Sequence, residues 1–152
     1  MTIHFICVGN TYRSRMAEAY LNSLKIRGLH ATSSGIKASE NENGPISWVA
    51  ARIIKKNNLV PFMSRDWQQT SKELLETSRL VIFFGQDYKD FCSINFTPAL
   101  KSYEVWEIGD IDLVLLNSAV KNKTVDDELI KQSEETFEKI KQRVDALVTS
   151  MQ

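Results

Sequence analysis

The residues whose types and spacing most clearly indicate chemistry are a cysteine and an arginine near the N-terminus, Cys7 and Arg13. A cysteine thiolate is a strong nucleophile, and an arginine guanidinium is a planar fork that can grip two oxygens of a phosphate. If the intervening loop presents its backbone N–H groups, it forms an anion cradle with a nucleophile at its base. This combination predicts phosphoryl transfer through a cysteinyl-phosphate intermediate.

The segments on either side predict where this loop lies. Residues 3–6, Ile-His-Phe-Ile, are a short apolar run typical of a buried parallel strand. Beyond the loop, Met16, Tyr20 and Leu24 recur at helical spacing. The loop therefore joins a strand to the N-terminus of a helix, where unpaired amides and the helix dipole favour an anion and a thiolate.

The wider pattern resembles a known family. Cys-x5-Arg-Ser directly after the first strand, with Gly9-Asn10 inside it and Met16-Ala17-Glu18 behind it, resembles the low-molecular-weight protein tyrosine phosphatases. The resemblance covers nearly the whole chain and implies a protein tyrosine phosphatase that hydrolyses phosphotyrosine monoesters with no metal or other cofactor. The competing interpretation is a buried structural cysteine with a surface arginine nearby.

The resemblance implies a role for each position of the loop. Cys7 is the expected nucleophile, Arg13 the phosphate-binding catalytic arginine, and Ser14 a hydrogen-bond partner of the sulfur. Asn10 tolerates left-handed backbone geometry and is expected to help curl the loop. The remaining substrate-binding positions of the loop are Val8, Gly9, Thr11 and Tyr12.

A third candidate catalytic residue follows a later predicted strand. Asp110 lies four residues after Trp106, the offset of the family's general acid, so the resemblance implies that it protonates the leaving group and then activates water. Ile111 stands where many family members have proline, which predicts a loop whose conformation is less preset. Asp112, the other aspartate of this loop, lies two residues beyond the position of the family's general acid. The alternative is that Asp110 merely occupies a polar loop.

Three further positions bear on the site through the resemblance. Ser33 is expected to hydrogen-bond toward Asn10, although simple turn chemistry explains residues 33–35 equally well. Trp48 either stacks on a substrate ring or packs on the sheet, with packing slightly favoured. Phe62 stands where histidine is common in the family, so whatever that histidine contributes must be absent or replaced.

Length and periodicity predict one domain of alternating strands and helices over residues 1–152, and the resemblance implies that it is phosphatase-like. The expected α/β architecture is a four-stranded parallel sheet with helices on both faces and the phosphate-binding loop after strand 1. Strands are predicted at residues 3–6, 29–36, 80–84 and 103–108, and helices at about 13–27, 45–56, 71–76, 87–91 and 126–149. Ligands of such sheets bind beyond the carboxyl ends of the strands, where Cys7 and Asp110 both fall.

Composition excludes several classes of function. Lys plus Arg and Asp plus Glu each number 19, so no global charge attracts nucleic acid. No apolar run reaches about 18 residues and no secretory leader is recognisable, which predicts a cytoplasmic protein without membrane insertion. The two cysteines show neither a disulfide framework nor zinc spacing, and His4 and His30 lie in predicted strands, so no metal site is expected.

Two alternative functions remain open. The same fold supports arsenate reduction. Because Cys92 is the only cysteine in addition to the nucleophile, such an enzyme would need an external thiol. The other is a phosphate-binding module with impaired catalysis, because Ile111 and Phe62 depart from the family pattern. The expected partner is a phosphotyrosine-bearing protein, whose ring would enter a slot lined by Tyr12 and Trp48. The sequence indicates no particular oligomeric state.

Overall fold

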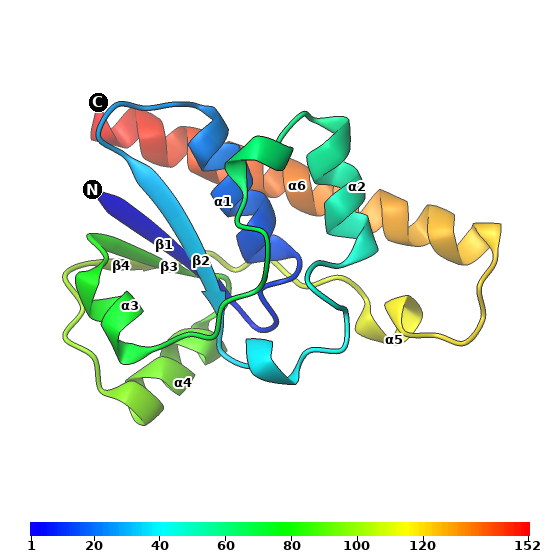
Figure 1. Cartoon of the computed structure of the whole chain (residues 1–152), viewed down its shortest axis with the longest axis horizontal. Coiled ribbons are helices and arrows are strands. Elements are labelled where there is room, and N and C mark those ends of the chain that lie inside the picture. Colours follow the sequence, from blue (N-terminus) through cyan, green and yellow to red (C-terminus); the bar gives the residue numbers. More distant parts are fainter.

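A four-stranded, all-parallel sheet forms the centre of the computed structural model, which describes residues 1–152 (Figure 1). Its strands are β1 (Thr2–Cys7), β2 (His30–Gly35), β3 (Leu80–Phe83) and β4 (Tyr103–Val105), in the spatial order β2-β1-β3-β4. Because all strands run the same way, their carboxyl ends meet at one edge.

Helices cover both faces of this sheet (Figure 1). One face carries α1 (Arg13–Ser23), α2 (Trp48–Lys56) and α6 (Lys123–Met151), and the other carries α3 (Lys72–Thr77) and α4 (Gln86–Phe96). The short α5 (Leu113–Leu116) follows β4, and 3-10 turns form at Ala38–Glu40 and Val60–Phe62. The predicted α/β architecture is confirmed. None of these helices combines the length and the apolar character that a membrane span requires.

Side chains that alternate along the strands divide the apolar interior into two layers. Ile3, Phe5 and Cys7 of β1 belong to the larger core, beneath α1, α2 and α6. Ile6 points the opposite way, into a smaller core that also contains Cys92 of α4. The sheet therefore separates the two cysteines.

α1 is shorter than its periodicity predicts. It ends at Ser23 and not near residue 27, because Lys25 adopts left-handed backbone geometry with φ 51°. The chain then turns through Gly28, whose φ of 78° suits a residue without a side chain. Gly28 thus ends the turn that follows the helix and not the helix itself.

Other element boundaries also differ from the prediction. α2 begins at Trp48, and not at Pro45, because the Ser47 hydroxyl accepts a hydrogen bond from the Ala50 N–H and caps the helix there. β4 is shorter than predicted, whereas α4 and α6 are longer, and the Asn122 side chain caps α6 ahead of the predicted start. α5 was not predicted.

His4 is a fully buried polar side chain of the central strand. Its Nδ1 lies 2.6 Å from Thr32 Oγ1 and its Nε2 lies 2.7 Å from Ser34 Oγ, which in turn lies 2.6 Å from Thr70 Oγ1. Burial lowers the pKa of His4 from 6.5 to about 4, so the ring is neutral in the folded protein near neutral pH. No group of three or more His, Cys, Asp or Glu side chains is arranged to hold a metal ion.

We predict that His4 makes stability depend on pH. The unfolded chain takes up a proton near pH 6.5 that the folded chain excludes until about pH 4. The stabilisation is therefore complete above pH 6.5 and is lost as the pH falls through this window, by on the order of 3 kcal/mol. Urea unfolding measured from pH 7.5 to pH 4.5 tests this, and His4→Asn should flatten the profile. An equally steep profile in His4→Asn would contradict it.

Candidate active site

Residues 8–12 form the loop between β1 and α1, at the edge of the sheet where the strands end (Figure 1). Cys7 is the last residue of β1 and Arg13 the first of α1. Between them Asn10 adopts left-handed backbone geometry with φ 56°. The curl predicted for Asn10 is therefore present, and the loop turns back over the end of β1.

Groups outside the loop hold the carbonyl oxygens at its start. The Cys7 carbonyl accepts a hydrogen bond from the Ile36 N–H at 3.0 Å, and the Val8 carbonyl accepts one from the Lys37 N–H at 2.9 Å. In a trans peptide the C=O and the following N–H point in opposite directions. The amides that follow these carbonyls consequently face away from residues 36–37, toward the interior of the loop.

The same arrangement continues on the other side of the loop. The Asn10 carbonyl accepts a hydrogen bond from Arg15 Nη1 at 3.2 Å. The Thr11 carbonyl accepts from both the N–H and the hydroxyl of Ser47, at 3.0 and 2.9 Å. With these carbonyls held outward, the loop's amides converge on one point, as an anion site requires.

The Cys7 sulfur lies within hydrogen-bond distance of the Ser14 hydroxyl. Cys7 Sγ is 2.8 Å from Ser14 Oγ. Asn10 Nδ2 donates to Ser14 Oγ at 2.8 Å and to Ser33 Oγ at 2.9 Å. Because Ser14 already accepts from Asn10, its own proton can point toward the sulfur and stabilise a thiolate. The Asn10–Ser33 hydrogen bond expected from the resemblance is present.

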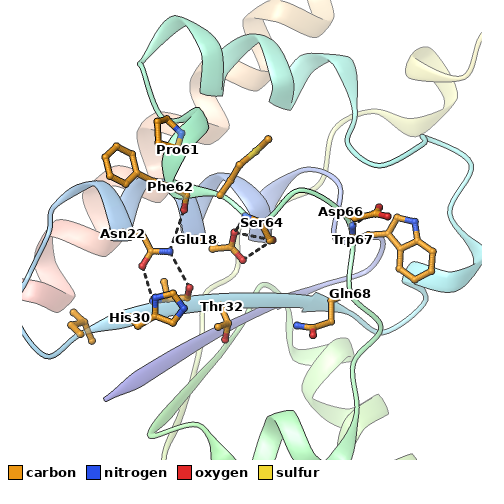
Figure 2. A pocket seen from close by; sticks show the side chains of 13 residues that line it. Glu18, Asn22, His30, Thr32, Pro61, Phe62, Ser64, Asp66, Trp67 and Gln68 are labelled. Atoms are coloured by element: carbon orange, nitrogen blue, oxygen red, sulfur yellow. Dashed lines mark hydrogen bonds between the residues drawn. The ribbon is translucent and has the colours of Figure 1, made fainter.

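A buried carboxylate anchors this network from behind. Ser33 Oγ donates to Glu18 at 2.8 Å. Both the N–H and the hydroxyl of Ser64 donate to the same carboxylate (Figure 2). The Gln68 N–H donates to Asn10 Oδ1 at 2.8 Å, which fixes the orientation of the Asn10 amide. In the chain of hydrogen bonds that runs from Glu18 through Ser33 and Asn10 to Ser14, each bond therefore has a defined donor and acceptor.

Phe62 lines a cavity of about 620 Å³ on the outer side of β2, which is separate from the site around Cys7 (Figure 2). This cavity borders Glu18 and Ser64 but contains neither Cys7 nor Arg13. Phe62 does not enter the hydrogen-bond network with its side chain. Ser64, two residues later, provides the donors that Glu18 needs, so the network is complete without a histidine.

Arg13 is a buried guanidinium, 2% exposed, at the start of α1. Nη1 donates to the Ile108 carbonyl at 2.9 Å, and Nη2 donates to Tyr88 Oη at 2.9 Å and lies 3.3 Å from Asp110 Oδ2. Its buried Nε has no partner. Burial opposes the charged form, but Cys7 and Asp110 outweigh it and raise the pKa of Arg13. A bound oxyanion would supply the partner that Nε lacks.

Cys7 and Asp110 line one cavity of about 260 Å³, together with Val8, Gly9, Thr11 and Tyr12 of the loop. Residues 40–43, which include the carboxylates Glu40 and Glu42, line it as well, and so does Lys37. After Asp110, the lining continues with Ile111, Leu113, Leu116 and Asn117. The structure thus brings the predicted nucleophile and the predicted acid into one pocket.

Trp48 lies outside this pocket. It is the first residue of α2, is 42% exposed, and is absent from the residues that line the cavity. The inward face of α2 is taken by Val49, Ala50 and Ile53, so Trp48 is turned toward solvent. Neither stacking over the pocket mouth nor packing on the sheet describes this side chain.

Ile111 fixes the loop that carries Asp110. It is only 3% exposed and belongs to the larger core, together with Ile108. Asp110 Oδ1 accepts the Ile111 N–H at 2.8 Å, whereas Asp112 caps α5 by accepting the Leu115 N–H at 2.9 Å. Apolar burial thus anchors the position where proline is common, and the expectation of a less preset loop stays a prediction. Asp112 does not line the pocket.

Arg15 and Glu18, for which the sequence predicts no role, are both buried. A signal was available in their spacing. Arg15, Glu18 and Asn22 lie at i, i+3 and i+7 of α1, and this stripe faces residues 62–64. On a surface helix such a polar stripe is normally solvated. Only the position of residues 62–64 in the fold shows that this stripe makes buried hydrogen bonds.

Comparison with known proteins identifies similar chains. The family described as "Low molecular weight phosphotyrosine protein phosphatase" matches residues 2–152. Proteins from Geobacillus stearothermophilus and Bacillus subtilis, each named protein-arginine-phosphatase, are 30% identical over 115 and 120 residues. These matches cover 72% and 73% of this chain and 75% and 77% of the relatives.

Solved structures share the fold. A low molecular weight protein tyrosine phosphatase from Bacillus subtilis superposes with a TM-score of 0.71 at 23% identity, covering 100% of both chains. An arginine phosphatase from Geobacillus stearothermophilus superposes with a TM-score of 0.68 at 23% identity, covering 98% of this chain and 94% of its own.

We predict that Gly35→Ala distorts the loop. A Cβ on Gly35 would lie 2.4 Å from the Val8 carbonyl oxygen and 2.7 Å from the Asn10 nitrogen, and this backbone has no room to yield. Vanadate binding should fall by more than about tenfold, since the loop amides lose their alignment. Gly28→Ala is the control: its φ of 78° is strained, yet nothing lies within 4 Å, so stability alone should fall. Equal vanadate affinity in both variants would contradict this prediction.

We also predict that peroxide inactivates the protein without recovery in dithiol. Cys92 lies across the sheet from Cys7, and burial raises the pKa of its thiol to about 12. An oxidised Cys7 therefore lacks a resolving partner and proceeds to higher oxidation states. Peptide mass spectrometry should find sulfinic or sulfonic acid at Cys7. Full recovery together with a Cys7–Cys92 disulfide would refute this.

Proposed function

Because this chain belongs to the low molecular weight phosphotyrosine protein phosphatase family, we propose that residues 1–152 are one phosphatase domain working through a cysteinyl phosphate. The observation that carries the proposal is the environment of Cys7. Its sulfur lies at the end of β1, among amides whose carbonyls are held outward and beside the Ser14 hydroxyl at 2.8 Å. The buried Nε of Arg13 has no hydrogen-bond partner and is available to a phosphoryl oxygen.

In the first step, the Cys7 thiolate attacks phosphorus and the bond to the leaving group breaks. The loop amides and Arg13 stabilise the charge on the equatorial phosphoryl oxygens. Asp110, in the same pocket, donates a proton to the leaving atom. The products of this step are the dephosphorylated side chain and the cysteinyl phosphate.

In the second step, water attacks phosphorus and the sulfur departs. Asp110, now a carboxylate, takes a proton from that water. The Ser14 hydroxyl stabilises the departing thiolate, because its proton points toward the sulfur. Inorganic phosphate and free Cys7 result, so the protein returns to its starting state.

Phosphoarginine is the side chain that we propose as the preferred substrate. Glu40 and Glu42 line the pocket with a single cation, Lys37, so the carboxylates outnumber it and complement a guanidinium. The curated relatives are named protein-arginine-phosphatases. Trp48 is exposed and does not line the pocket, so it is not placed to stack on a phosphotyrosine ring.

Phosphotyrosine is the second candidate, and a specific observation favours it. Ile111, Leu113 and Leu116 give the pocket an apolar part of its lining, and the aromatic side chain of Tyr12 lines it as well. An aromatic ring could pack there. Arsenate reduction would depend on an external thiol, because the only other thiol of the chain, Cys92, lies in the other core, and no specific observation favours it.

The substrate assignment predicts a preference between two peptides. Phosphoarginine peptide should be hydrolysed at least about tenfold faster, in kcat/KM, than phosphotyrosine peptide of the same flanking sequence. Glu40→Gln combined with Glu42→Gln should lower the ratio of the two kcat/KM values. Cys7→Ser should abolish turnover of both peptides and keep part of the vanadate affinity. Faster turnover of phosphotyrosine would select the second candidate, and full activity in Cys7→Ser would exclude the cysteinyl phosphate.

The placement of the two aspartates predicts different effects of their removal. Asp110→Asn should slow the hydrolysis of phenyl phosphate by about 10²- to 10⁴-fold. It should slow the hydrolysis of nitrophenyl phosphate far less, because nitrophenolate is a good leaving group and needs little protonation. Asp112→Asn should leave both rates nearly unchanged, because Asp112 caps α5 outside the pocket. The reverse pattern would identify Asp112 as the acid.

A further inference from the structure

Arg15 is the most completely buried cation of this protein whose role is not explained by the proposed chemistry. It lies in the first turn of α1 and is 0% exposed. A cation in that position opposes the helix dipole, and no acidic residue lies in the same turn to offset it. Such an unfavourable local placement indicates that the side chain serves another purpose.

The guanidinium of Arg15 joins three segments that no backbone ladder connects. Nη1 donates to the Asn10 carbonyl at 3.2 Å and to the Pro45 carbonyl at 2.9 Å. Nη2 donates to the Ser64 carbonyl. One planar fork thereby holds the phosphate loop, the segment before α2 and the segment after the second 3-10 turn.

The Asn10 carbonyl is the critical contact of the three. Asn10 has left-handed backbone geometry, which is uncommon for a residue other than glycine, so the contacts of its carbonyl must support that conformation. With that carbonyl directed to Arg15, the Thr11 N–H points the opposite way, into the pocket that contains Cys7. The other outward carbonyls are held by backbone N–H groups or by Ser47, and this one depends on Arg15.

Charge supports the same role. Burial lowers the pKa of Arg15, and Glu18, Asp66 and Cys7 oppose this change through their charges. Glu18, one turn along α1, is buried as well and accepts hydrogen bonds from Ser64, whose carbonyl Arg15 holds. Arg15 therefore remains a guanidinium and adds positive charge behind the sulfur of Cys7.

We propose that Arg15 is a positioning residue for phosphoryl transfer, which orients the Thr11 amide toward the phosphoryl oxygens by holding the Asn10 carbonyl. Arg15 does not touch the substrate. The inference rests on the proposed function only in treating the loop after β1 as the phosphoryl site, and it is independent of whether arginine or tyrosine carries the phosphate.

The experiment compares Arg15→Met with Asn22→Ala. Asn22 is the matched control: it lies on the same helix and holds the Ala31 backbone and the Phe62 carbonyl, without touching the loop (Figure 2). Arg15→Met should lose about 10- to 100-fold in vanadate affinity and in kcat for nitrophenyl phosphate, because one oxyanion donor is misaligned. Asn22→Ala should lower the unfolding midpoint and keep vanadate affinity within about twofold.

Chemical rescue separates positioning from folding. In Arg15→Ala, added guanidinium ion at low millimolar concentration should restore part of kcat, whereas sodium chloride at equal ionic strength should not. If Arg15→Met fails to fold, Arg15→Lys provides the comparison, since an ammonium keeps the charge but cannot bridge three carbonyls as a planar fork. Its vanadate affinity should still be reduced.

The outcomes distinguish this inference from the proposed function. Wild-type protein that neither binds vanadate nor hydrolyses nitrophenyl phosphate would refute the proposed function itself. Active wild-type protein, with an Arg15→Met or Arg15→Lys variant that is less stable yet equals it in kcat and vanadate affinity, would overturn the role of Arg15 alone.

Discussion

The outward hydrogen bonding of the loop after β1 is the constraint on which the rest of the site depends. A run of amides can bind an anion only if its carbonyls are directed elsewhere, since each peptide unit carries both groups. Here the carbonyls of Cys7, Val8, Asn10 and Thr11 find partners on residues 36–37, on Arg15 and on Ser47. The anion site is therefore built by segments far from it in sequence.

The close approach of Gly35 to this loop follows from the same constraint. Gly35 ends β2 directly beside residues 8–10, so near that any side chain would meet backbone atoms. The adjacent N–H groups of residues 36 and 37 can reach the loop carbonyls only because of that approach. The end of β2 is thus part of the site's framework, although it contributes no catalytic side chain.

Two buried hydrogen-bond systems lie on opposite faces of β1. One runs from Glu18 through Ser33 and Asn10 to Ser14 and ends at the sulfur of Cys7. The other, around His4, lies on the opposite face of β1 and bears on stability. Because successive side chains of a strand point to opposite faces, β1 contributes to both systems without mixing them. The same alternation isolates Cys92 from Cys7.

The amino-acid sequence by itself determined the class of fold and the place of the loop. Apolar runs, helical periodicity and the six-residue spacing from Cys7 to Arg13 are local patterns, and local patterns are what short-range physics translates into strands, helices and their junctions. The tertiary structure decided which side chains face the site. It turned Trp48 to solvent, buried Ile111 as the anchor of the Asp110 loop, and directed Arg15 inward. These orientations depend on contacts between segments that are distant in sequence, and no local pattern specifies them.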